Sequence, residues 1–332
     1  MSGATHRQKP PPRMDDGYGS NKFMKIQAER MAPLTDSHPQ PLAGNQKPRL
    51  SWSAAARLIR LHSQTGTWLL LLPTLWSLVL AARGFPPLGL IVTFAAGSFL
   101  MRSAGVVLND LADRAVDREV ARTRTRPLAS GELGFGHACL LAAFLLGAAL
   151  TLVLTLNQLT LLLSPIAVVL AGLYPFAKRV VHVPQAMLGI AFGWGTIMAW
   201  AASRGTVESP AWLLFGATIC WAIGYDTIYA LQDREDDRRI GVKSSALFFG
   251  RWTWLAVAAA LGMMLTFLAL AGWSIGIGWI YYAALAVAGG FFAVQVAELS
   301  GSVPAARAFT LFHRHVWIGS GILAGTLAGF LW

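Results

Sequence analysis

Residues 136–157, GHACLLAAFLLGAALTLVLTLN, contain no Asp, Glu, Lys or Arg. An α-helix rises 1.5 Å per residue, so about 20 apolar residues cross the hydrocarbon core of a bilayer. Similar runs recur along the chain, whose 332 residues are 55% hydrophobic and only 13% charged. Soluble domains carry roughly 25% charged residues. The sequence therefore predicts an all-α membrane protein.

The apolar runs predict about nine transmembrane helices, each approaching the length that a spanning helix needs. They lie at about 67–83, 88–110, 136–157, 158–174, 184–203, 211–232, 252–272, 275–297 and 314–332. Residues 1–50 are instead rich in Pro, Gln and Lys and show no apolar period, which predicts a disordered cytoplasmic tail. Residues 51–332 are predicted to form one polytopic domain.

The net charge of +11 does not indicate a nucleic-acid partner, because the basic residues lie in short segments between apolar runs. This distribution is typical of cytoplasmic loops, and it makes membrane lipids the expected surroundings. Alternate connections hold sixteen Lys and Arg residues on one side and only Arg83 and Arg204 on the other. The positive-inside rule then predicts a cytoplasmic amino terminus and an outside carboxy terminus. A bacterial inner membrane is the expected location, with the mitochondrial inner membrane as the alternative.

Most acidic residues beyond residue 50 gather in two motifs. The first follows the second predicted span and reads NDLADRAVD from Asn109 to Asp117. Within it, Asn109, Asp113 and Asp117 recur every four residues, so a helix places them on one face.

The second motif follows the sixth predicted span and repeats this spacing with Tyr229, Asp233 and Asp237. Asp226 lies seven residues before Asp233 and so joins the same helical face. Both spans are predicted to run from outside to inside, which brings both acidic stripes to the cytoplasmic surface. Basic residues and a small-residue turn follow each motif, and this repetition predicts two similar halves of one duplicated plan.

Two facing stripes of carboxylates repel one another unless a cation lies between them. Mg²⁺ binds one or two carboxylates together with substrate phosphates, and flanking Arg and Lys side chains suit the remaining phosphate oxygens. The pattern therefore predicts a diphosphate held by Mg²⁺ between the stripes. A membrane transporter is the alternative from another class, but it would place acids near the bilayer midplane within inverted repeats.

At these residues the chain resembles the UbiA-type intramembrane prenyltransferases, and within them the 4-hydroxybenzoate polyprenyltransferases. The resemblance runs from about Arg57 to the carboxy terminus. The segments that carry it are NDLAD at 109–113 with RT at 122–123 and RPL at 126–128, YPF at 174–176 with KR at 178–179, and the run from GYDT at 224–227 to KS at 243–244. The chain departs from the family before Gly66, where His62 and Gln64 replace the usual acid and proline.

The resemblance implies nine helices around a central cavity that opens sideways into the bilayer. It also implies Mg²⁺-dependent transfer of a polyprenyl group from polyprenyl diphosphate to 4-hydroxybenzoate, in ubiquinone synthesis. Prenylation of another acceptor such as homogentisate is the alternative within the family. In this reaction Mg²⁺ would be held by Asp113, Asp117, Asp233 and Asp237, and fixed positive charge for the diphosphate would come from Arg122, Arg126, Lys178 and Lys243.

The remaining predicted roles concern the allylic cation and the aromatic acceptor. Tyr229 and Tyr174 could stabilise the cation through their ring faces, although ordinary packing explains Tyr174 equally well. Asn109 and Asp226 are predicted to face the substrates. Arg60 is the predicted partner of the acceptor's carboxylate, and the alternative is that it only anchors the chain at the membrane surface. The scattered histidines, His315 among them, are predicted to be solvated and are assigned no role.

Overall fold

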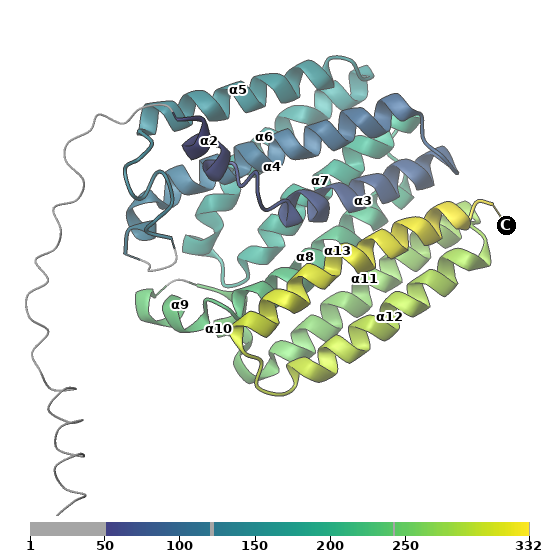
Figure 1. Ribbon diagram of the computed structural model, residues 1–332. Coiled ribbons are helices and arrows are strands. Elements are labelled where there is room, and N and C mark those ends of the chain that lie inside the picture. Colours follow the sequence, from purple (N-terminus) through teal and green to yellow (C-terminus); the bar gives the residue numbers. More distant parts are fainter. Residues whose placement is uncertain (1–50, 120–122, 242, 332) are drawn as a thin grey trace, which may run out of the picture. The chain divides into compact units, whose positions relative to one another are not determined.

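The computed structural model describes residues 51–119, 123–241 and 243–331, and the predicted tail therefore lies outside the described residues. The described chain is helical and contains no strand. Its helices, shown in Figure 1, are α2 (Trp52–Leu58), α3 (Thr65–Ala82), α4 (Leu88–Asp117), α5 (Phe135–Val153), α6 (Gln158–Val180), α7 (Pro184–Arg204), α8 (Ser209–Ala230), α9 (Arg234–Ile240), α10 (Ser245–Phe249), the short 3-10 helix η1 (Gly250–Trp252), α11 (Thr253–Ile275), α12 (Trp279–Leu299) and α13 (Ala305–Ala328).

Eight segments of the described chain are long and apolar enough to cross a membrane. The ninth long helix, α13, has 24 residues but carries two Arg and two His in its first half, which lowers its hydropathy. It nevertheless packs against α3, α8 and α12 as part of the same bundle. The protein is thus a multi-pass helical membrane protein, and the prediction of about nine helices agrees with eight such segments together with α13.

Several predicted span limits differ from the helix limits, because hydropathy marks where apolar residues stop and not where a helix stops. Helix α4 continues through the first acidic motif to Asp117, and α13 begins at Ala305 rather than at 314. Helix α6 also passes through Pro165 and Pro175 without ending. Prolines are tolerated in membrane helices because neighbouring groups satisfy the freed carbonyls.

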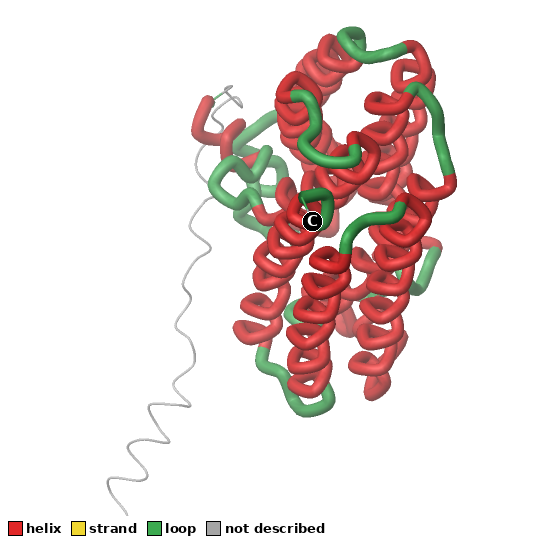
Figure 2. Tube along the Cα trace, turned by 90° about the vertical axis from the view of Figure 1, so that its right-hand side faces the viewer, coloured by secondary structure: helices red, strands yellow, loops and turns green. Residues whose placement is uncertain are grey.

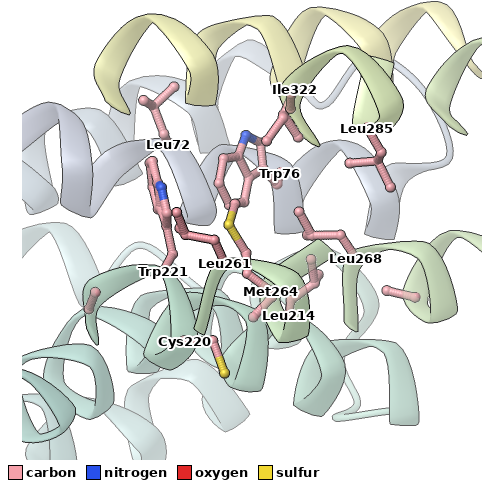
Figure 3. Packing of buried hydrophobic residues seen from close by; sticks show 14 of the residues in the cluster. Leu72, Trp76, Leu214, Cys220, Trp221, Leu261, Met264, Leu268, Leu285 and Ile322 are labelled. Atoms are coloured by element: carbon pink, nitrogen blue, oxygen red, sulfur yellow. The ribbon is translucent and has the colours of Figure 1, made fainter. Parts of the chain in front are cut away.

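The largest buried cluster joins α3, α7, α8, α11, α12 and α13. At its centre the rings of Trp76 on α3 and Trp221 on α8 lie 4.9 Å apart, and Figure 3 shows them among Leu72, Met264 and Ile322. Glycine allows the helices to approach closely, since a Cβ atom at Gly189 of α7 would lie 2.7 Å from the Cα atom of Ile219. Close approach through small residues is how helices pack in membranes, where apolar burial alone does not drive association.

Short loops join most of the long helices, as Figure 2 shows, whereas residues 118–134 form a longer connection between α4 and α5. In Figure 1 the small helices α2, α9 and α10 lie at the end of the bundle opposite the carboxy terminus. The first acidic motif ends α4 and the second begins at the end of α8, both at the end that carries these small helices. The two motifs therefore share one end of the bundle.

The second acidic motif does not lie on one continuous helix, and this corrects the predicted stripe. Helix α8 ends at Ala230, a turn follows, and α9 begins at Arg234 with Asp233 in the N-cap position. Asp237 lies one turn inside α9, where its backbone N–H donates to the carbonyl oxygen of Asp233 at 2.8 Å. The backbone dipoles favour carboxylates at the amino terminus of a helix. The acids at 233 and 235–237 therefore favour the start of a new helix, α9, at this point.

Candidate functional site

A cavity of about 450 Å³ lies between α3, α4, α5, α6, α7, α8 and α13. Its wall is polar near the end of the bundle that carries the acidic motifs and apolar along α5, α6 and α7. The polar wall includes Arg60, Arg102, Asn109, Asp110, Arg126, Tyr174, Tyr225, Asp226, Tyr229 and His313. Such a cavity suits a ligand with a charged head and an apolar body.

The carboxylate of Asp110, on the last turns of α4, is buried and holds two arginines at the cavity wall. Arg60 Nη2 donates to its Oδ2 and Oδ1 atoms at 2.9 and 3.0 Å, and Arg126 Nη1 donates to Oδ1 at 3.1 Å. Arg126 also donates to Oδ2 of Asp117 at 2.9 Å. Two guanidinium groups and two carboxylates therefore form one connected network, in which each buried charge has an opposite partner.

This network bears on the predicted role of Arg60. Arg60 Nη1 also donates to the carbonyl oxygens of Arg57 and Leu58, both at 3.2 Å. The Arg60 guanidinium is thus bonded to Asp110 and to the backbone at the end of α2. Pairing with an acceptor carboxylate stays a prediction for Arg60, but the contacts favour the alternative, in which Arg60 anchors the chain.

Asn109 and Asp113 share a face of α4, as their spacing predicted, and Asn109 Nδ2 donates to Asp113 Oδ2 at 3.1 Å. Asp113, Asp117, Asp233 and Asp237 do not line the cavity wall itself. Within the described residues, no three His, Cys, Asp or Glu side chains are close enough to hold a metal ion together. Each motif still offers carboxylates one helical turn apart, and Mg²⁺ needs only one or two when phosphate oxygens supply other ligands.

The predicted basic residues lie in different parts of the structure. Arg126 is in the network with Asp110, whereas Lys243 Nζ donates to the carbonyl oxygen of Val180 at 3.1 Å. Arg122 lies outside the described residues, and the Lys178 side chain does as well. The predicted substrate residues Tyr174, Asp226 and Tyr229, by contrast, all lie on the cavity wall.

Arg102 is a site residue that sequence reasoning missed. It lies in the middle of α4 and lines the cavity, and its buried Nη1 atom has no hydrogen-bond partner. The guanidinium packs over Gly66, because a Cβ atom there would lie 2.6 Å from Arg102 Nε. The signal was present in the sequence: an arginine inside an apolar run is costly and marks a functional position by default.

Fold, cavity and acidic motifs define a polytopic membrane protein whose cavity is polar at the end of the bundle that carries the two acidic motifs. Residues 70–317 match the model of the UbiA prenyltransferase family. The chain belongs to the UbiA prenyltransferase family.

Curated relatives cover most of this chain and nearly all of their own length. The chain is 45% identical over 280 residues to the 4-hydroxybenzoate octaprenyltransferase of Sodalis glossinidius (strain morsitans), a match that covers 84% of this chain and 96% of that protein. It is 46% identical over 278 residues to the enzyme of the same name from Pectobacterium carotovorum subsp. carotovorum (strain PC1), with the same two shares.

Solved structures share the fold. A UbiA homologue from Aeropyrum pernix K1, solved in its apo form, superposes with a TM-score of 0.68 at 26% identity and covers 79% of this chain and 97% of that one. A homologue from Archaeoglobus fulgidus, solved with GPP and Mg²⁺, superposes with a TM-score of 0.59 at 17% identity and covers 84% of this chain and 100% of that one.

Proposed function

We propose that this protein transfers a polyprenyl group from polyprenyl diphosphate to the ring of 4-hydroxybenzoate, with Mg²⁺ as cofactor, in ubiquinone biosynthesis. The names of relatives about 45% identical over most of the chain support the reaction. The observation that carries the proposal is Arg102, a guanidinium on the polar wall of the cavity whose buried Nη1 atom has no hydrogen-bond partner among the described residues.

A buried cation is costly unless an opposite charge pairs with it. Arg60 and Arg126 have Asp110 as their partner, but no described residue forms a hydrogen bond or a salt bridge with Arg102. The carboxylate of an aromatic acid is small and planar, and it accepts the two parallel N–H bonds that a guanidinium offers. Arg102 therefore replaces Arg60 as the acceptor's proposed carboxylate partner.

The reaction is an electrophilic substitution on the aromatic ring. The bond between the allylic carbon and the diphosphate oxygen breaks, and its electron pair leaves with the diphosphate. The ring carbon ortho to the hydroxyl group forms the new carbon–carbon bond and then loses its proton, which the released diphosphate can accept. Tyr229 and Tyr174 on the cavity wall can stabilise the allylic cation through their ring faces. The apolar part of the cavity keeps water from capturing that cation.

The two acidic motifs are proposed to hold Mg²⁺ through Asp113, Asp117, Asp233 and Asp237. Bound there, the metal would act as a Lewis acid that neutralises charge on the departing diphosphate. Arg126 and Lys243, with Arg122 and Lys178, would add fixed positive charge around the same group. The oxygen-rich donor set of these motifs suits a hard divalent cation such as Mg²⁺.

The proposed location is a bacterial inner membrane, with the acidic motifs on the cytoplasmic side. Bacterial relatives support the location, and the excess of Lys and Arg at that end of the bundle supports the orientation.

The test is a transfer assay in membranes that contain the expressed protein, with labelled polyprenyl diphosphate and either 4-hydroxybenzoate or homogentisate as acceptor. Product with 4-hydroxybenzoate is expected. The Arg102→Gln variant should raise the KM for this acceptor roughly 100-fold or more, because a buried charge loses its partner. Arg83→Gln, an exposed arginine at the opposite end of the bundle, is the matched control and should change nothing. No transfer to 4-hydroxybenzoate by the wild type would refute the proposal.

A further inference from the structure

Two buried polar atoms on the cavity wall have no protein partner. Nine side chains of the described chain carry a buried nitrogen or oxygen atom without a hydrogen bond. Of these nine, Arg102 and Tyr225 line the cavity, through Arg102 Nη1 and the phenolic oxygen of Tyr225. The residues of the cavity wall therefore include one cationic donor atom and one hydroxyl that no described protein group satisfies.

Tyr225 is held rigidly on α8. Its side chain is only 1% exposed, and its ring meets the ring of Trp221 edge-on at 5.4 Å. Two rings of α13 close the other sides, Phe312 at 6.0 Å and His315 at 5.9 Å. His315 is itself fully buried and accepts a hydrogen bond from Trp221 Nε1 at 2.9 Å, so the prediction that it is solvated was wrong.

This packing explains why the Tyr225 side chain cannot rotate to bring its hydroxyl to a hydrogen-bond partner in the protein. In native proteins about nine in ten buried polar groups are paired. Leaving a buried hydroxyl unpaired costs stability, and a ring enclosed by three aromatic neighbours cannot turn its oxygen toward another protein group. A hydrogen bond from a polar group of the bound substrate would offset this loss of stability.

We propose that the Tyr225 hydroxyl hydrogen-bonds the phenolic hydroxyl of the aromatic acceptor, whose carboxylate pairs with Arg102. This inference rests on the proposed function and deepens it by naming a residue that selects for a hydroxylated ring. Hydroxyl groups both donate and accept hydrogen bonds, so the pair forms whichever oxygen supplies the proton. Arg102 on α4 and Tyr225 on α8 then fix opposite ends of one ring.

The contact would also orient the reacting carbon. Tyr225 and Tyr229 are four residues apart on α8 and therefore share a face of the helix. The Tyr229 ring, proposed to stabilise the allylic cation, lies 4.9 Å from Phe312, which also borders Tyr225. A hydroxyl held at Tyr225 brings the adjacent ortho carbon to the side of the cavity where Tyr229 lies.

The test is the Tyr225→Phe variant, which removes one oxygen atom and leaves the packing unchanged. The transfer assay gives the KM for 4-hydroxybenzoate and for the prenyl diphosphate, and the inhibition constant of benzoate, which lacks the hydroxyl. We expect the KM for 4-hydroxybenzoate to rise roughly 10-fold, with the other two constants unchanged. The melting temperature of the substrate-free protein should stay the same or rise, because the lost hydroxyl had no partner.

Tyr281→Phe is the matched control. Tyr281 is equally buried, but its hydroxyl donates to the carbonyl oxygen of Leu268 at 2.8 Å and does not line the cavity. This variant should lower the melting temperature and leave all three constants unchanged. If Tyr225→Phe leaves the KM for 4-hydroxybenzoate unchanged, or weakens benzoate binding equally, the inference is overturned. The proposed function still stands in that case if the wild type prenylates 4-hydroxybenzoate, and wild-type inactivity toward this acid would overturn both.

Discussion

Arg60 and Asp110 lie 50 residues apart in the chain, yet Nη2 of Arg60 contacts both carboxylate oxygens of Asp110 at 2.9 and 3.0 Å. The Asp110 side chain is 1% exposed and that of Arg60 is 20% exposed. The pair ties the segment before α3 to the last turns of α4, on the cavity wall. Because Arg126 joins the same carboxylate, one buried acid positions two cations beside the proposed diphosphate site.

Replacement of Asp110 by Asn should destabilise the protein more than any exposed charge change. The variant leaves Arg60 without its carboxylate partner and Arg126 with Asp117 alone, and breaking a buried pair in this way costs about 3–5 kcal/mol. Thermal unfolding of the purified protein in detergent measures the loss. The control is Glu132→Gln, which breaks an exposed pair with Arg57 and should cost less than about 1 kcal/mol. Equal melting temperatures for the two variants would show that Asp110 does not anchor the site.

Removal of the proposed metal ligands should abolish transfer without preventing membrane insertion. Asp113→Ala and Asp233→Ala each remove a carboxylate from one motif, and EDTA should inactivate the wild type until Mg²⁺ is restored. The measurement is product formation per amount of protein found in the membrane. Glu119→Ala and Glu235→Ala change exposed acids beside the same motifs and should keep activity. Full activity in either Asp variant contradicts metal sharing between the motifs.

Gly66→Ala should weaken acceptor binding by displacing Arg102. A Cβ atom at this position would lie 2.6 Å from Arg102 Nε, so the guanidinium must move. The end of a long, flexible side chain can move at a small cost in free energy. We therefore expect a melting temperature within a few degrees of that of the wild type. The KM for 4-hydroxybenzoate should rise several-fold, while the KM for the prenyl diphosphate stays the same.

Gly105→Ala is the control for this substitution. Gly105 also lies on α4 and lines the cavity, but an added Cβ atom there meets nothing within 4 Å. Its kinetic constants should equal those of the wild type. A matching change in both glycine variants would mean that added volume in the cavity, and not the position of Arg102, governs acceptor binding.

The topology predicted from the basic residues is open to a direct measurement. A reporter fused after Trp332 should read outside, and a reporter inserted in the loop after Asp117 should read cytoplasmic. If α13 crosses the membrane, the chain makes an odd number of crossings between these two positions, and the two reporters then lie on opposite sides. A cytoplasmic reading at Trp332 would show that α13, with its four basic or histidine residues, does not cross the membrane.

Local sequence patterns were sufficient for the positions of the helices and for the polar end of the cavity. Helices α7 and α8 begin and end within two residues of the predicted limits 184–203 and 211–232, because transfer of an apolar run into lipid depends on that run alone. The spacing of Asn109 and Asp113 also placed them on one face of α4, since three to four residues complete a helical turn.

Tertiary structure decided which of these polar residues face one another. The sequence offered Arg60 as a free cation, and only the packing of α4 beside the segment before α3 shows that Asp110 holds it. Arg102 and Tyr225 lie within apolar runs, so a count of charged residues in the loops does not detect them. Their surroundings depend on other helices, through Gly66 of α3 beside Arg102 and a ring of α13 beside Tyr225. Membrane insertion is fixed locally along the chain, whereas the pairing of buried polar groups depends on contacts between residues far apart in sequence. For that reason local sequence patterns were enough to predict a polytopic membrane helix bundle with two acidic motifs, whereas the side chains that line its cavity depend on how the helices pack.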